Sequence, residues 1–190
     1  MHPNLDNMEK PMSGSILIAE PFLGDPNFDR SVVLLTEHGD EGTVGYVLNR
    51  PLDVKIEGLL PDFPEFQSRI YNGGPVEQSN LYFLHNRPDL FEGAIKVSEN
   101  IYWGGDFDRL REVVSLGLLG QDEIRFFLGY SGWGRGQLES ELEEQSWMVL
   151  SPSALDIFHA NPEEMWKEVI AQQGGDYQLW ANAPSDPLLN

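Results

Sequence analysis

The densest group of residues that could carry chemistry lies between Phe126 and Trp147, where glycines alternate with aromatic, serine and arginine side chains. Four of these glycines fall within residues 129–136. The mostly apolar run 124–130 predicts a buried strand before them, and leucines spaced four apart predict a helix after them. Because backbone N–H groups at the start of a helix bind anions, a strand, a glycine-rich loop and a helix could together hold phosphate.

The match to known phosphate-binding loops is incomplete. Gly129 and Gly134 have the Walker A spacing. The next two residues, Arg135 and Gly136, replace the Lys and the Ser or Thr that such a loop requires. The glycines also lack the third position of the dinucleotide-binding fingerprint, and the glutamates of the following helix would repel an anion. The pattern favours a structural turn or a partner-contact loop, and a nucleotide- or phosphometabolite-binding enzyme that uses residues 129–136 is the alternative.

Residues suited to nucleophilic or metal catalysis are present without a recognisable arrangement. The internal histidines are His38, His85 and His159, each isolated in sequence, and nothing marks any of them as a base beside a nucleophile. Ser131 lies among glycines, yet the GxSxG elbow is absent, as are the HExxH and EF-hand patterns. We therefore identify no catalytic residue, metal ligand or cofactor. The question of enzymatic activity stays open, with a non-enzymatic protein favoured.

A ligand- or partner-binding surface is predicted from loop position and from polar or aromatic character. Its candidate residues are Asn49, Arg50, Gly73, Gly74, Tyr130, Trp133, Arg135 and Gln137. A guanidinium group can bind a carboxylate or phosphate, although it more commonly pairs with a neighbouring acid. Convergence of the two arginines on one pocket would favour a ligand or an enzyme, and separate positions with each arginine paired to an acid would favour a protein partner. The two aromatic residues could form a stacking platform or fill gaps in the core.

The charge balance restricts the possible partners. The chain of 190 residues has 31 acidic and 12 basic residues and a formal net charge of −19, so it lacks the basic footprint of nucleic-acid-binding proteins. Direct binding of nucleic acid is therefore disfavoured, and the expected partner is an unidentified protein or small molecule. The chain has no cysteine, no apolar leader and no membrane-spanning run, so we expect a cytoplasmic protein that does not associate with a membrane.

The elements that would position these residues are mostly short strands. Turn residues and apolar runs predict strands at 15–22, 31–38, 43–50, 81–86, 124–130 and 147–151, and capping signals predict helices at 107–118 and 161–173. Many short strands need closure or cover for their edges, so we predict an α+β fold with a mixed sheet curled on itself and a few flanking helices. The length suits a single domain at 13–180, between a flexible N-terminal tail at 1–12 and an irregular C-terminal tail at 181–190.

Five segments, in this order, resemble the AlgH/YqgE family of bacterial proteins. They are GSILIAEPFLGDPNFDRSVVLLTEH at 14–38, GTVGYVLNRP at 42–51, NGGPV at 72–76, YWGGDF at 102–107 and FFLGYSGWGRGQLESEL at 126–142. The match runs from Ser13 to Leu150. One departure is Arg135, which stands where relatives often have a proline, and we expect it to change the rigidity of the loop more than the fold.

The resemblance implies a compact α+β domain whose bifurcated sheet folds into a pseudo-barrel. It also implies the label of transcriptional regulator, but it brings no established catalytic residues. The net charge and the lack of a helix-turn-helix signature argue against direct promoter binding. We therefore expect a protein that acts through a protein or small-ligand partner, with any effect on transcription indirect.

Overall fold

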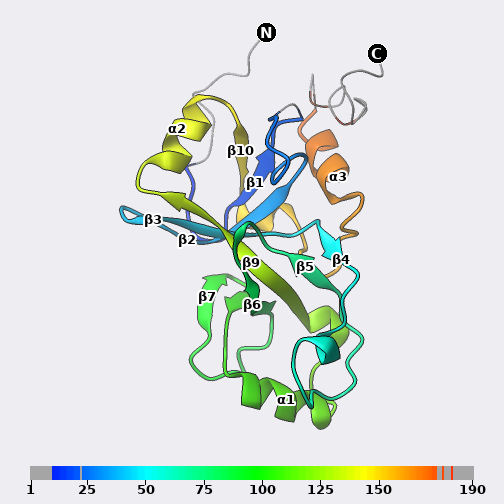
Figure 1. Ribbon diagram of the computed structural model, residues 1–190. Coiled ribbons are helices and arrows are strands. Elements are labelled where there is room, and N and C mark those ends of the chain that lie inside the picture. Colours follow the sequence, from blue (N-terminus) through cyan, green and yellow to red (C-terminus); the bar gives the residue numbers. More distant parts are fainter. Residues whose placement is uncertain (1–9, 22, 175–176, 178–180, 182–190) are drawn as a thin grey trace.

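The computed structural model describes residues 10–21, 23–174, 177 and 181, and this part of the chain combines ten β-strands with three α-helices (Figure 1). The described part is therefore α+β, as the sequence predicts. Most of the two predicted tails, 1–12 and 181–190, lies outside the described residues.

Most strands form one antiparallel path. The strands are β1 (Ile16–Ala19), β2 (Val32–Gly39), β3 (Gly42–Val47), β4 (Pro51–Leu52), β5 (Ile70–Asn72), β6 (Val76–His85), β7 (Ile95–Ser98), β8 (Ile101–Trp103), β9 (Ile124–Gly134) and β10 (Trp147–Leu150). Their order is β10-β1-β2-β3-β9-β6-β8-β7, and every neighbouring pair on this path is antiparallel. Strands β4 and β5 lie off the path, and β5 pairs with β9 in parallel, so the sheet is mixed.

The helices are short and lie outside the sheet. They are α1 (Phe107–Ser115), α2 (Gln137–Glu143) and α3 (Met165–Ala171), with 3-10 helices at Ile56–Gly58, Gln121–Glu123 and Pro152–Ala154. Asp106 caps α1 as predicted, because its Oδ1 accepts a hydrogen bond from the N–H of Arg109 at 2.8 Å. Helix α3 begins later than predicted, since residues 162–164 form a turn. Among the described residues, no helix has both the length and the apolar character to cross a membrane.

The sheet branches at β9. Residues Phe126–Leu128 lie between β5 on one side and β6 on the other, whereas Ser131–Gly134 pair with β3. The path ends at β10 and β7, and no pairing among the described residues joins these two edges. Ser13, which precedes β1, donates a hydrogen bond from its Oγ to the carbonyl of Val97 in β7 at 3.4 Å. The sheet is therefore not closed, and the predicted pseudo-barrel is not confirmed.

The glycines of β9 allow close backbone packing. Residues 129–134 belong to the strand, so the predicted loop at 129–136 is wrong for all but its last two residues. Gly129 has a φ of +71°, and a Cβ atom there would lie 2.7 Å from the carbonyl oxygens of Gly74 and Val76. A side chain would collide with that backbone, which explains the glycine by close approach. Without a glycine-rich loop before α2, the alternative of a phosphate-binding site lacks the loop geometry that it requires.

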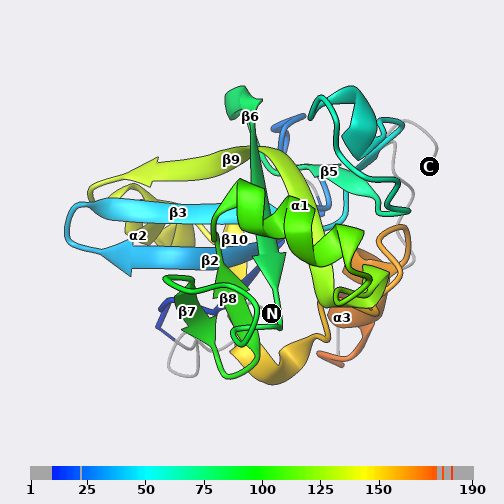
Figure 2. The same ribbon diagram turned by 90° about the horizontal axis from the view of Figure 1, so that it is seen from below.

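Successive residues of β9 point into different cores, because side chains alternate across a strand. Phe126 packs with Phe83 and α1 in one cluster, and Phe127 packs with Tyr46 and α3 in a second. Trp133 packs with α2 in a third. Figure 2 shows α1 lying across β6 and β9 when the molecule is seen from below, and Figure 1 shows α2 and α3 at the opposite end of the sheet. The three helices thus cover three separate apolar clusters around one central strand.

Candidate functional site

Three of the predicted surface residues, Asn49, Gly73 and Gly74, are explained by their contacts with the backbone of neighbouring segments. The Asn49 side chain accepts a hydrogen bond from the N–H of Val32 at 2.9 Å and donates one to the carbonyl of Arg30 at 2.9 Å. Gly73 and Gly74 pass so close to β9 that a Cβ atom on either would lie 2.3 Å from a backbone oxygen. Local geometry therefore explains all three residue types without a ligand.

Trp133 and Gln137 belong to a hydrogen-bonded network around Glu141. The Nε1–H of Trp133, a residue only 4% exposed, donates to Glu141 Oε2 at 2.8 Å. The Nε1–H of Trp147 donates to the same oxygen at 2.7 Å, and Gln137 Nε2 donates to Glu141 Oε1 at 2.9 Å. Tyr130 is half-buried and packs edge-to-face against another tyrosine. The alternatives for Tyr130 and Trp133 are a stacking platform and the filling of gaps in the core. Trp133 fits core filling, and its hydrogen bond to Glu141 attaches α2 to the sheet.

Arg50 and Arg135 are held by different segments. Two nitrogens of Arg50 donate to the carbonyl oxygens of Pro26 at 3.3 Å and Asp29 at 2.8 Å. The Nε–H of Arg135 donates to the carbonyl of Asp40 at 3.0 Å. Neither arginine borders the two cavities described below. The two arginines therefore do not share either cavity. A ligand site built on both of them would require a shared one.

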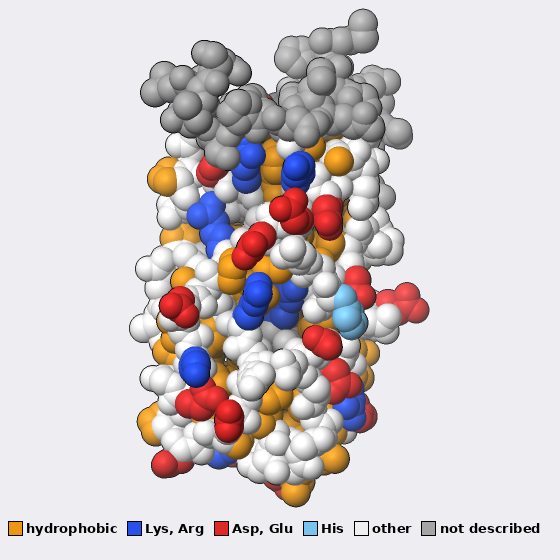
Figure 3. Space-filling view, turned by 90° about the vertical axis from the view of Figure 1, so that its right-hand side faces the viewer, with side chains coloured by type: hydrophobic (Ala, Val, Ile, Leu, Met, Phe, Trp, Pro, Cys, Tyr) orange, Lys and Arg blue, Asp and Glu red, His pale blue; other side chains and the backbone are white. Residues whose placement is uncertain are grey.

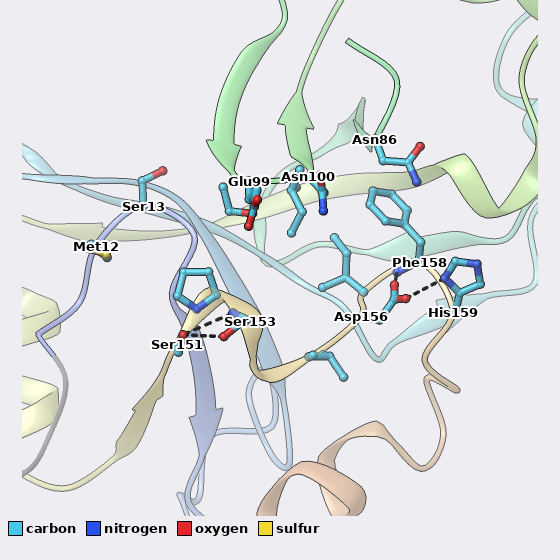
Figure 4. Close-up of a pocket in the computed structure, with 15 residues that line it drawn as sticks. Met12, Ser13, Asn86, Glu99, Asn100, Ser151, Ser153, Asp156, Phe158 and His159 are labelled. Carbon is cyan, nitrogen blue, oxygen red and sulfur yellow. Dashed lines mark hydrogen bonds and ion pairs between the residues drawn. The ribbon is translucent and has the colours of Figure 1, made fainter. Parts of the chain in front are cut away.

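A cleft of about 910 Å³ opens between the two edges of the strand path (Figure 4). Its lining comes from residues 12–13 before β1, residues 98–101 at the turn from β7 to β8, Asn86 after β6 and most of residues 151–159 after β10. Because β10 and β7 do not pair, the segments next to them leave this space open. The volume lies within the range of about 300–1,000 Å³ that is typical of small-molecule pockets.

The cleft carries two polar side-chain pairs. His159 Nδ1 lies 2.9 Å from Asp156 Oδ2, and Ser151 Oγ lies 3.0 Å from Ser153 Oγ. Figure 4 shows the two pairs at separate places along the lining, so the histidine has no serine beside it. Nucleophilic catalysis needs the nucleophile within hydrogen-bond reach of its base. Among the described residues, no cluster of three or more His, Asp or Glu side chains could hold a metal ion.

Gly14 lies where the segments around the cleft come together. Its φ is +90°, and a Cβ atom there would lie 3.0 Å from the carbonyl oxygen of Val97 and 3.2 Å from Pro152 Cγ. The neighbouring Ser13 Oγ donates to the carbonyl of Thr36 at 2.8 Å. These segments pack closely around residue 14, and together with the positive φ this explains the glycine there.

His85 is buried below this region and is fully hydrogen-bonded. Its Nε2–H donates to the carbonyl of Gly104 at 3.1 Å, and its Nδ1 accepts from the N–H of Arg87 at 3.1 Å. Burial lowers the pKa of His85, and the bond to Gly104 acts in the opposite direction. The ring is therefore neutral at neutral pH, and its two hydrogen bonds fix the backbone at Gly104 and Arg87, near the end of β6.

Sequence reasoning did not select the cleft residues, because they come from four separate segments and form no motif. The available signal was weak: short, mostly polar segments at 99–100 and 151–153 directly follow the two strands β7 and β10. Such segments are common on protein surfaces. Only the meeting of these segments in space distinguishes them from others of the kind.

Comparison with known proteins gives consistent matches over most of the chain. A family model described as AlgH-like matches residues 16–178. A UPF0301 protein of Cytophaga hutchinsonii is 45% identical over 178 residues, which cover 93% of this chain and 98% of that protein. A UPF0301 protein of Chlorobium limicola is 39% identical over 186 residues, which cover 98% and 100% of the two chains.

Two solved structures resemble this fold. The solution structure of the AlgH protein from Pseudomonas aeruginosa has a TM-score of 0.70 and 29% sequence identity, and the match covers 94% of this chain and 98% of that one. The crystal structure of a Corynebacterium diphtheriae protein has a TM-score of 0.76 and 23% identity, covering 92% and 94% of the two chains. The second likeness is one of fold.

Proposed function

The chain belongs to the AlgH-like family, and from that premise we propose that it acts by binding a small ligand or a partner segment in the cleft, without catalysing a reaction. Any effect on transcription is then indirect, through whatever the cleft binds. We propose that the protein acts in the cytoplasm, because a chain without cysteine cannot form the disulfide bonds that an oxidising compartment favours.

The observation that carries this proposal is the cleft itself. Its volume of about 910 Å³ can hold a small molecule or a short peptide segment. Apolar side chains such as Leu155 and Phe158 line it together with polar ones such as Glu99 and Asn100. Apolar contact area provides affinity in such sites, and a few polar groups orient the ligand.

We further propose that the sheet as a whole is a pseudo-barrel left open at this cleft.

Two other functions receive less support. A phosphometabolite enzyme at residues 129–136 would need a loop where β9 continues, and Glu139 in the first turn of α2 would repel an anion. Direct DNA binding would need a basic face, and the net charge is −19. Within the cleft, the separation of the serine pair from the Asp156–His159 pair favours binding over nucleophilic catalysis.

The test is a ligand-observed NMR screen with a variant that fills the cleft. Ser153 is exposed and lines the cleft, so Ser153→Trp would place an indole ring in it. Ser115→Trp is the matched control, since Ser115 is exposed at the end of α1 and does not border the cleft. The library contains amino acids, organic acids, nucleosides and sugars, each at about 1 mM, so that dissociation constants into the millimolar range are detected.

We expect saturation-transfer signals from at least one compound class with the wild-type chain and with Ser115→Trp, and their loss with Ser153→Trp. If the signals of every compound that binds the wild-type chain persist with Ser153→Trp, binding lies elsewhere and the cleft is refuted as the site; signals that persist for organic acids alone do not decide this. No signal from any compound would refute small-ligand binding.

A further inference from the structure

Arg125 is a buried cation with neutral protein partners. It is 5% exposed and is the only Lys or Arg among the buried residues of the described part of the chain. Its Nη1 donates to the carbonyl of Leu48 at 3.1 Å, and its Nη2 donates to the carbonyl of Ala160 at 3.0 Å. The guanidinium carbon lies 4.7 Å from the centre of the Tyr71 ring. These contacts hold the guanidinium group in a fixed orientation.

No carboxylate of the described residues lies at ion-pair distance from this guanidinium group. Among the described residues, the ion pairs of arginine involve Arg87, Arg109 and Arg111, and Arg125 has none. A buried charge normally requires a paired counter-charge, because removal from water is costly. The chain has 31 acidic residues, so acids are not scarce. The missing counter-charge is therefore specific to the surroundings of Arg125.

Arg125 lines a cavity of about 190 Å³, separate from the cleft. Arg69, exposed and without an ion pair among the described residues, lines the same cavity and adds a second positive charge. Ser68 and Gln121 supply hydrogen-bonding groups, and Asp122 supplies one negative charge. Figure 3 shows Lys or Arg side chains beside a histidine near the middle of the face that carries β4 and α3.

The electrostatics around Arg125 favour an incoming anion. Burial lowers the pKa of Arg125 and the positive charge of Arg69 acts in the same direction, whereas Tyr71 and Asp156 act against them. Arginine nevertheless remains protonated at neutral pH. An anion in the cavity would supply the counter-charge that the described residues do not place there.

We propose that this cavity binds the carboxylate of a short-chain organic acid, with Arg125 as the main counter-charge and Arg69 as a second one at its mouth. The planar guanidinium fork matches a carboxylate. The cavity is smaller than the 300 Å³ or so of pockets for larger molecules. Its lining is mostly polar, with Ile124 and Phe158 among its few apolar residues, so an acid with a short chain fits it best. Asp122 and the nearby Asp156 oppose a second negative charge, so a monocarboxylate fits better than phosphate.

This inference does not depend on the proposed function of the cleft. Phe158 lines both cavities, but Arg125 and Arg69 border only the smaller one. Binding of a carboxylate near Arg125 should therefore survive the Ser153→Trp substitution. Failure of one proposal would leave the other standing.

The experiment is an NMR titration of the full ¹⁵N-labelled chain with formate, acetate, propionate and butyrate, at an ionic strength held constant with sodium chloride. The reporters are the Arg125 Nε–H signal and the backbone amides of residues 68–71 and 121–125. We expect saturable shifts at these positions for at least one acid. Arg69→Gln should weaken binding about two- to fivefold, as for the loss of one exposed charge partner.

Arg135→Gln is the matched control, because it removes one exposed positive charge outside the cavity. It should leave the affinity unchanged. Arg125→Met should abolish the saturable shifts, provided that its amide spectrum remains that of the folded chain; if it does not fold, the Arg69→Gln comparison decides. Any one of three results would overturn the proposal. The shifts could fail to saturate, Arg69→Gln and Arg135→Gln could weaken binding equally, or inorganic phosphate could bind more tightly than any of the acids.

Discussion

The Glu141 network allows a quantitative test of what attaches α2 to the sheet. One carboxylate oxygen accepts hydrogen bonds from the indole N–H groups of both Trp133 and Trp147, which are 4% and 2% exposed. Glu141→Ala would leave both indole N–H groups without this acceptor. Glu141→Gln would keep an oxygen acceptor for the two indoles, and it would lose the charge and the oxygen that accepts from Gln137 Nε2.

The expected loss follows from the cost of an unsatisfied buried donor. That cost is about 1–3 kcal/mol for each N–H group, so Glu141→Ala should lower the free energy of unfolding by about 2–6 kcal/mol. In a chain of this size, 1 kcal/mol corresponds to about 2–4 °C in Tm, so Tm should fall by roughly 4–24 °C. Glu141→Gln should cost about 1 kcal/mol, because neutral hydrogen bonds are weaker than charge-assisted ones.

Urea unfolding followed by far-UV circular dichroism and tryptophan fluorescence measures these changes. Glu143→Ala is the matched control, since Glu143 is an exposed glutamate near the same end of α2. It should change the free energy of unfolding by less than about 0.5 kcal/mol. If Glu141→Ala behaves like Glu143→Ala, the carboxylate does not hold the two indoles, and the account of how α2 is attached is wrong.

Three further predictions can be measured by the same urea titrations. Because burial lowers the pKa of His85, the unfolded chain binds a proton at a pH where the folded chain does not, so stability should fall as the pH drops below about 6.5. His85→Gln should flatten that dependence, and an unchanged slope would show that other groups cause it. Gly74→Ala, which places a Cβ atom 2.3 Å from backbone at a φ of +150°, should cost about 3 kcal/mol or more. Gly58→Ala, with no atom within 4 Å of its Cβ, should cost less than about 0.5 kcal/mol, and equal effects would contradict the close-approach argument. Asp106→Ala should cost about 1 kcal/mol through loss of the cap of α1, whereas Asp106→Asn should recover most of it; no difference between the two would refute the cap.

Local features were predictable because neighbouring residues carry them. The apolar runs 31–38 and 147–151 correspond to β2 and β10, and Asp106 before an amphipathic segment marked the start of α1. The five ordered motifs predicted the family that the match over residues 16–178 confirms. Periodicity, capping and turn chemistry all act within a few residues, so a single sequence records them.

The glycine-rich stretch shows where local reasoning fails. Glycine indicates that a side chain is not tolerated, but it does not say whether a turn or a neighbouring backbone is the cause. At Gly129 the cause is the backbone of Gly74 and Val76, which lie in another part of the chain. Trp133 likewise looks exposed in a glycine context, and it is buried because α2 and Trp147 close over it.

The sequence by itself determined the α+β class, the family and the net charge of −19, since composition and short-range pattern set these properties. Only the tertiary structure decided where binding could occur. The cleft is formed by segments that lie next to the unpaired edge strands β10 and β7, and Arg125 is buried because Leu48, Tyr71 and Ala160 surround it. Both depend on which distant segments meet in space, and this information is spread over the whole chain and not held in any one motif.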